Sequence, residues 1–365
     1  MDFVKLASIC NLKQWSTIAK TDLSDSGYPV WGANGIIGYS NKYNHTERTI
    51  MICCRGATCG SINISDGKCY INGNAMCLDN LSKEFNLDFI AYYLKNYDFK
   101  KTITGVAQPQ ITKISLDIVE VPKLPIEKQQ EIAQNLKKLE LCLTKTRIKL
   151  KKYDDLVKSQ FIEMFENEKF ENVNLENVCT KITDGSHNPP KGIDFSNYPM
   201  LSSQNINQQI NFSNVRYLNE SDFLRENKRT QVAKGDILVT IVGTIGRSVV
   251  VQDEIITLQR SVAVIKPNSN MNSYYINQYL KSETAQKQFS RKAHGSSQKG
   301  IYLGDLKKLQ IPTPPIELQN QFADFVKHID KLKFSETITK LKNLCYNVFN
   351  VIQSKNLGEV KNDKL

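Results

Sequence analysis

The chain has 365 residues, of which 40% are hydrophobic and 23% charged, a composition typical of soluble globular proteins and too apolar for a disordered chain. Its length favours two domains, because a single hydrophobic core stops growing near ~250–300 residues. Lys and Arg outnumber Asp and Glu by 48 to 37. The resulting net charge of +11 favours a polyanionic partner such as nucleic acid, with a generally basic surface as the alternative.

The sequence shows no signal for export or membrane insertion. Its longest apolar run, Ile237–Gly246, has the length of a buried strand and is too short to span a bilayer. The first residues contain no basic region followed by an apolar stretch, so we expect no signal peptide. The nine cysteines have no regular spacing, which argues against a secreted disulfide scaffold. We therefore expect a cytoplasmic protein.

The first segment, residues 1–125, predicts a strand-rich mixed domain. Short β-branched runs such as Thr49–Cys54 and Ile62–Ile64 are bounded by Gly and Asn, which is typical of strands. A helix is predicted over Leu87–Tyr97. This combination indicates an α+β domain.

A long helix is predicted next, over residues 126–165. From Glu127 to Phe165 the sequence contains neither Pro nor Gly, and two prolines precede it, as is typical of a helix start. The apolar residues follow the four- and three-residue steps of a heptad repeat, with Gln129 at one of the polar positions of the seam.

Residues 166–315 predict a second mixed domain. Strands are expected at Ile237–Val242 and Ser248–Val251, and one helix at Ser273–Phe289.

A distal helix is expected over residues 316–354, with a break in its heptad pattern near Lys331–Thr337, and a flexible tail over residues 355–365.

An internal duplication explains this order. The segments Thr104–Pro125 and His294–Pro315 match at a constant offset of 190 residues, so that Gln108 corresponds to Gln298. The register continues without a gap into both helices, where Gln129 corresponds to Gln319. A period of this length indicates duplicated domains and not a solenoid.

We therefore predict an α+β fold in which two mixed α/β domains, related by a pseudo-two-fold duplication, are joined by two long helices. The helices most simply bury their seams against each other as an antiparallel coiled coil, and the alternative is that each packs on its own domain. The predicted seam residues, which would also support partner docking, are Leu136, Leu139, Leu143, Leu150, Tyr153, Val157, Val326, Ile329, Leu341 and Val348.

Motifs for catalysis are weak. Asn188-Pro189-Pro190 matches part of the loop with which amino-methyltransferases hold a target amine, but Lys191 occupies the position of the stacking aromatic residue and no glycine-rich cofactor loop precedes it. No phosphate-binding loop of the ATPase type is present. We predict no catalytic residue in this chain.

Five cysteines between Cys53 and Cys77 suggest a metal site at first sight. They contain no C-x₂-C pair, and the only nearby histidine is His45, so the spacing is wrong for structural zinc. We predict small buried thiols and no metal site.

Polar and basic loop residues are the candidates for contact with DNA, because Arg reads guanine and Asn or Gln reads adenine in the major groove. Glycine-rich turns at residues 55–60 and 243–247 lie beside Arg55 and Arg247, and a tight turn between strands is the alternative interpretation. For every single candidate the alternative is an ordinary surface or turn residue. The candidates are Arg55, Lys100, Lys101, Gln110, His187, Asn188, Lys191, Gln204, Asn205, Arg247, Arg260, Arg291, Lys292 and Lys299.

Five segments together carry a resemblance to a known family. They are Gly27–Tyr43, Ile182–Gly192 and Lys234–Ser248 in the mixed domains, and Val121–Ala133 and Ile311–Ala323 at the starts of the helices. In this order and at one offset, they make nearly the whole chain resemble the DNA-specificity subunit of a type I restriction–modification system.

The resemblance implies that each mixed domain is a target-recognition domain that reads one half of a bipartite, asymmetric site in double-stranded DNA. It implies that the helices fix the spacing and dock two modification subunits, which carry S-adenosylmethionine and methylate adenine. Restriction motor–nuclease subunits would join the complex. The resemblance implies no cofactor in this chain itself, and no membrane contact is expected.

Three other functions are open at this point. A self-sufficient methyltransferase or nuclease is disfavoured by the missing cofactor loop. A stand-alone DNA-binding or architectural protein without enzymatic partners would share the basic charge. A coiled-coil scaffold would share the helices but would bind no DNA.

Overall fold

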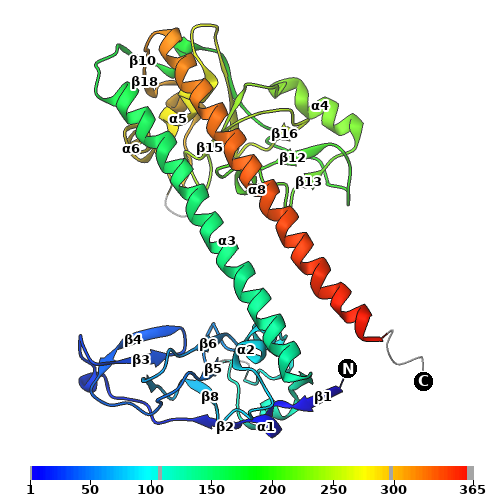
Figure 1. Ribbon diagram of the computed structural model, residues 1–365. Helices are drawn as coiled ribbons and strands as arrows, with labels where there is room; N and C mark the ends of the chain where they lie inside the picture. The colour runs from blue at the N-terminus through cyan, green and yellow to red at the C-terminus, as the bar shows by residue number, and fades with distance from the viewer. Residues whose placement is uncertain (1, 106–108, 296–298, 360–365) are drawn as a thin grey trace. The chain divides into compact units, whose positions relative to one another are not determined.

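The computed structural model describes residues 2–105, 109–295 and 299–359, and beyond residue 337 it describes the backbone of the last helix only. Gln108 and Gln298, which the duplication pairs, lie outside the described residues. The chain divides into two compact units, one formed by residues 1–145 with 340–365 and the other by residues 146–339. Figure 1 traces the elements of both units along the chain.

The first unit contains the mixed domain predicted near the N-terminus. Its strands are β1 (Asp2–Lys5), β2 (Asn11–Gln14), β3 (Tyr28–Gly32), β4 (Gly35–Ser40), β5 (Ile50–Cys53), β6 (Ile62–Ile64), β7 (Tyr70–Ile71), β8 (Ala75–Asp79) and β9 (Glu120–Lys123). Its helices are α1 (Leu6–Ile9), α2 (Leu87–Lys95), the 3-10 turns η1 (Lys20–Asp22), η2 (Phe99–Lys101) and η3 (Ile114–Ile118), and the first part of α3 (Ile126–Phe161).

The second unit begins within α3, which ends in the π-helical turn η4 (Ile162–Glu166). Its strands are β10 (Asn172–Asn174), β11 (Cys179–Asp184), β12 (Pro199–Leu201), β13 (Arg216–Tyr217), β14 (Ile237–Thr240), β15 (Ser248–Val250), β16 (Thr257–Leu258), β17 (Val262–Pro267) and β18 (Gln310–Pro312). Its helices are η5 (Leu175–Val178), η6 (Ser203–Asn205), α4 (Glu220–Thr230), α5 (Ser273–Lys281), α6 (Glu283–Lys292), α7 (Leu303–Lys307) and the first part of α8 (Ile316–Glu359).

The two units have the same sheet topology, which confirms the predicted duplication and the α+β fold. The four-stranded sheets have the orders β2-β8-β5-β6 and β11-β17-β14-β15. The three-stranded sheets have the orders β4-β3-β7 and β13-β12-β16, each with one antiparallel and one parallel pair. A two-stranded pair, β1 with β9 or β10 with β18, precedes each long helix. Segments that differ in sequence therefore share one architecture.

Strand β14 shows why a continuous apolar run forms a central strand. Its side chains alternate between the two faces of the sheet, so Ile237 and Val239 join one hydrophobic cluster and Leu238 joins another. All four of its residues are buried. Because both faces are covered, the strand is apolar throughout and does not alternate with polar residues.

Two helix predictions need correction. The single helix expected over Ser273–Phe289 is two helices, because Ser282 takes an extended conformation and its hydroxyl caps α6 by accepting a hydrogen bond from the Ala285 N–H. The predicted end at residue 354 is also wrong, since α8 continues to Glu359. Residues 355–359 contain no proline, and their one glycine, Gly358, costs only about 1 kcal/mol relative to Ala in a helix.

The matched glutamines lie at the start of each long helix and not in a seam. Gln129 is fully buried, its side-chain oxygen accepts from the Asn86 N–H at 2.8 Å, and its amide nitrogen donates to the carbonyls of Glu84 and Leu124, each at 2.8 Å. Asn86 is the N-cap of α2. The amide therefore joins α3 to α2 within the first unit, a role that the heptad pattern did not indicate.

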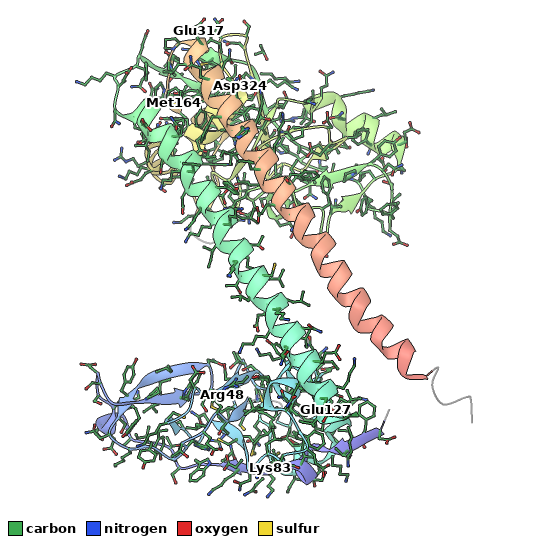
Figure 2. All side chains as sticks on the ribbon, viewed as in Figure 1. Arg48, Lys83, Glu127, Met164, Glu317 and Asp324 are labelled. Atoms are coloured by element: carbon green, nitrogen blue, oxygen red, sulfur yellow. The ribbon has the colours of Figure 1, made fainter. Side chains whose placement is uncertain are left out.

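Gln319 makes the equivalent contacts in the second unit. Its oxygen accepts from the N–H of Asn272, the N-cap of α5, at 2.8 Å, and its nitrogen donates to the Pro314 carbonyl at 2.8 Å. The neighbouring Glu127 and Glu317 lie in the first turns of α3 and α8 (Figure 2). Acidic side chains at this position interact favourably with the helix dipole.

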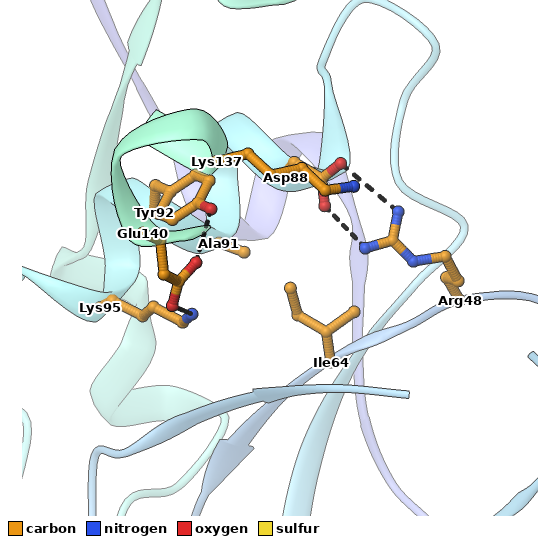
Figure 3. A pocket seen from close by; sticks show the side chains of 8 residues that line it. All are labelled: Arg48, Ile64, Asp88, Ala91, Tyr92, Lys95, Lys137 and Glu140. Atoms are coloured by element: carbon orange, nitrogen blue, oxygen red, sulfur yellow. Dashed lines mark hydrogen bonds and ion pairs between the residues drawn. The ribbon is translucent and has the colours of Figure 1, made fainter. Parts of the chain in front are cut away.

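A second link joins α2 to α3 within the first unit. Glu140 of α3 accepts a hydrogen bond from the Tyr92 hydroxyl at 2.8 Å and lies 3.8 Å from the Lys95 ammonium (Figure 3). On the other side of the same small pocket, Arg48 pairs with Asp88. Desolvation and the nearby Glu140 carboxylate raise the pKa of Tyr92 to about 12.

The second unit contains an antiparallel stretch of α3 and α8. Lys149 pairs with Glu336 at 2.5 Å, and Asp154 pairs with Lys333 at 2.7 Å. Residue numbers therefore rise along α3 where they fall along α8, as in an antiparallel pair. Farther along, the ring of Phe161 contacts the ring of Phe322. A coiled coil along the whole length of both helices stays a prediction.

The predicted seam residues fall into four groups. In the second unit, Val157 and Ile329 belong to the buried core, and Tyr153 and Val326 pack against it. Leu139 and Leu150 are half-buried, whereas Leu136 and Leu143 are exposed. Side chains of the remaining two, Leu341 and Val348, lie outside the described residues. Among the described residues, no helix is both long and apolar enough to cross a membrane.

Candidate nucleic-acid interface

Sheet topology gathers several loops of the second unit at one edge. β11 and β14 each pair antiparallel with β17, and their last residues, Asp184 and Thr240, lie opposite Ala263 and Val262 at its start. The loops that follow β11 and β14 therefore lie beside the loop that precedes β17. We call residues 185–191, 241–247, 259–261 and 299–300 the second strand-end surface.

Backbone hydrogen bonds tie these loops together. The Arg260 N–H donates to the Ser186 carbonyl at 2.9 Å, the Ile241 N–H to Ser261 at 2.9 Å, and the Gly243 N–H to Lys299 at 2.9 Å. The sequence candidates His187, Arg247, Arg260 and Lys299 are thus brought to one edge and exposed. Asn188 and Lys191 follow in the same loop and are exposed as well.

Gly185 allows the close packing of this surface. A Cβ at this position would lie 2.1 Å from the Leu258 carbonyl oxygen, a distance that no side chain tolerates. The absence of a side chain lets the Ser186 N–H donate to that same carbonyl at 2.7 Å. The glycine in the sequence Asp184-Gly185-Ser186-His187 is therefore required by a backbone approach.

Asp184 holds the side chains of His187 and Arg229 at the same edge. The buried carboxylate accepts a hydrogen bond from His187 Nε2 at 2.8 Å on one oxygen, and its other oxygen pairs with Arg229 Nη2. His187 was a sequence candidate, whereas Asp184 and Arg229 were missed. They are 45 residues apart, and no local motif links them.

The first unit has an equivalent edge. The last residue of β5, Cys53, lies opposite the first residue of β8, Ala75. The turn after β5 contacts the loop at residues 109–110. The backbone of Arg55 forms an isolated antiparallel β-bridge with Gln110, and the Gly56 N–H donates to the Pro109 carbonyl at 3.3 Å. We call residues 55–60, 100–101 and 109–110 the first strand-end surface.

Lys100 and Lys101 join this surface through a glycine contact. A Cβ on Gly60 would lie 3.0 Å from the Cβ of Phe99, so the turn packs directly on η2. Both lysines follow Phe99 in η2 and are exposed, as are Arg55 and Gln110. All four candidates of the first unit therefore lie near one another.

The arginines at these edges differ in their charge environment from the arginines that pair with carboxylates. Arg48 and Arg225 pair with carboxylates of Asp88 and Asp222. Within the described part of the chain, the guanidinium groups of Arg55, Arg247 and Arg260 make no hydrogen bond or ion pair, and all three are exposed. Exposed cations that no acid neutralises are the groups that attract phosphate.

Three candidates lie beside the second strand-end surface. Gln286 and Phe289 of α6 pack on Gly246, and Arg291 and Lys292 end that helix. The third, exposed Gln204, follows Ser203, whose N–H donates to Ser261 Oγ at 3.0 Å.

Asn205 was a candidate for contact with DNA, but its side chain is buried. It is 1% exposed, and its amide bridges the Ser202 N–H and the carbonyl of Asn211, both at 2.9 Å. The side chain has no free polar atom to offer to a base. We therefore propose that Asn205 shapes the loop over residues 202–213 and does not contact DNA.

A cluster of possible metal ligands does form in the first unit. Ligand atoms of His45, Cys77 and Asp79 lie within 4.8 Å of one another. The His45 nitrogens already lie 2.7 Å from Asn44 Oδ1 and 3.0 Å from Asp79 Oδ1, and Trp15 Nε1 donates to the other Asp79 oxygen at 3.1 Å. Desolvation, together with Asp79, raises the pKa of the Cys77 thiol. These contacts support a buried hydrogen-bond network.

Both units of the chain resemble known proteins. The family model of the type I restriction modification DNA specificity domain matches residues 1–152 and 167–344. A putative type I restriction enzyme specificity subunit of Haemophilus influenzae is 26% identical over 332 residues, which cover 87% of this chain and 84% of that protein. The MjaVIII specificity subunit of Methanocaldococcus jannaschii is 25% identical over 348 residues, covering 86% of this chain and 81% of that protein.

A solved structure shows the same fold. The crystal structure of a type I restriction-modification system S subunit from M. genitalium superposes with a TM-score of 0.62 and 14% identity, covering 96% of this chain and 94% of that one. Because the family model matches most of both units, the chain belongs to the type I restriction–modification specificity subunits, which are DNA-recognition components and not catalysts.

Proposed function

We propose that this chain reads a bipartite, asymmetric site in double-stranded DNA, with one half-site at the strand-end surface of each unit. The observation that carries the proposal is the set of exposed arginines without an acidic partner, Arg55 in one unit and Arg247 and Arg260 in the other, at equivalent edges of equivalent sheets. The two surfaces differ in sequence, which supports different half-sites. Such a protein would act in the cytoplasm.

The long helices are the proposed spacer and docking platform. Gln129 and Gln319 each join a helix to its recognition domain through a buried amide, which supports a fixed angle between them. Leu141 and Ile148 of α3 are 55% and 54% exposed and are spaced by one heptad. We propose that apolar side chains of this kind dock two modification subunits, which carry S-adenosylmethionine, and that restriction motor–nuclease subunits join that complex.

Binding of the purified chain to duplex DNA across a salt series tests the proposal. A chain that contacts phosphates with several cations should lose affinity linearly on a log–log plot as salt rises. Arg55→Ala and Arg247→Ala should each weaken binding by about tenfold, as expected for loss of one good contact. Arg225→Ala is the matched control, because its guanidinium already pairs with Asp222 and Glu226. Binding without salt dependence, or equal losses in all three variants, would contradict the proposal.

Co-purification with the modification subunits tests the proposal that the long helices dock them. The subunits should elute with the wild-type chain and should be lost when Leu141 and Ile148 are replaced by Asp. Leu224→Asp on α4 is the control, because Leu224 is 57% exposed, similar to Leu141 and Ile148, but lies outside both long helices. A chain that binds DNA but retains no subunit would instead support a stand-alone DNA-binding protein.

A further inference from the structure

We infer that Arg229, held in place by the buried carboxylate of Asp184, contacts a phosphate of the bound DNA in the second unit. This inference rests on the proposed function and adds a contact that comes from α4, outside the strand-end loops. Asp184 would act through Arg229 as a positioning residue.

The carboxylate is built into the sheet and uses both oxygens. Asp184 ends β11, its side chain is 8% exposed, and one oxygen accepts from His187 Nε2 at 2.8 Å while the other pairs with Arg229 Nη2. A buried carboxylate is unfavourable unless it is paired and hydrogen-bonded. This one carboxylate therefore holds the side chains of Arg229 and His187 beside each other at the surface.

Arg229 keeps donors available for a second acceptor. Its side chain is 50% exposed, Nη2 pairs with Asp184, and Nε donates to Thr183 Oγ1 at 3.4 Å, so Nη1 has no partner among the described residues. A guanidinium carries five N–H donors in a planar fork whose geometry suits phosphate oxygens. Because the side chain is already ordered by Asp184, binding a phosphate costs less conformational entropy than ordering a free arginine would.

The local surroundings favour DNA as the source of that phosphate. Asp184 directly precedes Gly185 and Ser186, and the Ser186 carbonyl accepts from the N–H of Arg260, one of the arginines without an acidic partner. Arg229 therefore continues the basic edge of the second strand-end surface. Phosphate contacts at the rim of such a surface fix the position of the duplex.

A duplex of arbitrary sequence is the appropriate probe, because non-specific binding reports phosphate contacts without base reading. With the full-length chain, Arg229→Ala should weaken binding by about tenfold and reduce the slope of log affinity against log salt by about 0.9. Arg229→Lys keeps the charge and should retain most of the slope. Arg225→Ala, on the same helix and paired with two carboxylates, should leave both quantities unchanged.

Asp184→Asn separates positioning from simple charge. The substitution removes a negative charge, so a purely electrostatic account predicts tighter binding to DNA. Positioning predicts weaker binding, because Arg229 loses the partner that orders it. In the double variant Asp184→Asn/Arg229→Ala, the loss should not exceed that of Arg229→Ala alone, since both changes remove the same contact.

Urea unfolding of each variant checks that the second unit is folded, and if Asp184→Asn unfolds, the comparison of Arg229→Ala with Arg229→Lys and Arg225→Ala decides. A wild-type chain that binds no duplex at low salt would overturn both the proposed function and this inference. A wild-type chain that binds, together with an Arg229→Ala variant that behaves as Arg225→Ala, would overturn the inference alone. Tighter binding by a folded Asp184→Asn would also overturn it.

Discussion

The side-chain oxygen of Gln129 accepts a hydrogen bond from the Asn86 N–H at 2.8 Å, and so connects the first turn of the long helix α3 to the N-cap of α2. The same relationship exists between Gln319 and Asn272 in the second unit. The proposed function requires each mixed domain to keep a defined angle to its long helix. A buried amide with both ends engaged suits that task, because it has one arrangement that satisfies all its partners.

Gln129→Leu should therefore destabilise the first unit. Leucine fits the space but cannot accept from Asn86 or donate to the Glu84 and Leu124 carbonyls, which leaves buried polar groups without partners. We expect a loss of about 3 kcal/mol in the free energy of unfolding. Urea unfolding followed by circular dichroism measures it.

The matched control is Gln134→Leu, an exposed glutamine on the same helix, which should change stability by less than about 0.5 kcal/mol. In the second unit, Gln319→Leu and the exposed Gln321→Leu form the equivalent pair. Equal effects of the buried and exposed substitutions would show that the amide does not hold the junction.

Gly185→Ala should disrupt the second strand-end surface. The new Cβ would be forced against the Leu258 carbonyl, so the loop after β11 must move away from the entry of β17. We expect a loss of about 2–3 kcal/mol in stability, typical of overpacking, and weaker DNA binding. Thermal unfolding and a binding titration measure the two effects.

Gly304→Ala is the control for this substitution, because nothing lies within 4 Å of the new Cβ and the residue is within helix α7. It should be neutral or up to about 1 kcal/mol more stable, since Ala favours helix over Gly. If the two alanine variants unfold alike, the close approach at Gly185 is not a constraint on the fold.

The features that the sequence predicted are those set by residues close together, or regularly spaced, along the chain. The duplication gave the repeated order of elements, and the absence of Pro and Gly gave the long helix, because both signals are local or periodic. The cap at Ser282 and the buried role of Gln129 depend on single hydrogen bonds that a heptad count does not see. Asp184 and Arg229 are joined only by the fold, so no spacing indicated them.

Alkaline pH should destabilise the first unit through Tyr92. Its pKa is raised from 10.0 to about 12 by desolvation and by Glu140, so the protonated hydroxyl favours the folded state. That contribution is present below pH 10 and is lost as pH rises from 10 to about 12, because the folded unit then binds the proton more tightly than the unfolded chain. The phenolate absorbance and the free energy of unfolding across this window measure it.

Two substitutions isolate this effect. Tyr92→Phe should remove part of the loss of stability between pH 10 and 12, and Glu140→Gln should lower the pKa of Tyr92 towards its usual value. A Tyr92 that titrates identically with and without the Glu140 carboxylate would contradict the contact shown in Figure 3.

The most direct test of the account is a map of N6-methyladenine in the source cell with the gene intact, deleted, or carrying Arg55→Ala or Arg247→Ala. The account predicts that deletion abolishes methylation of one split, asymmetric motif. It also predicts that the Arg55 substitution affects only one half of that motif and the Arg247 substitution only the other. A methylome that is unchanged by deletion, in cells that produce the modification subunits, would contradict the central claim.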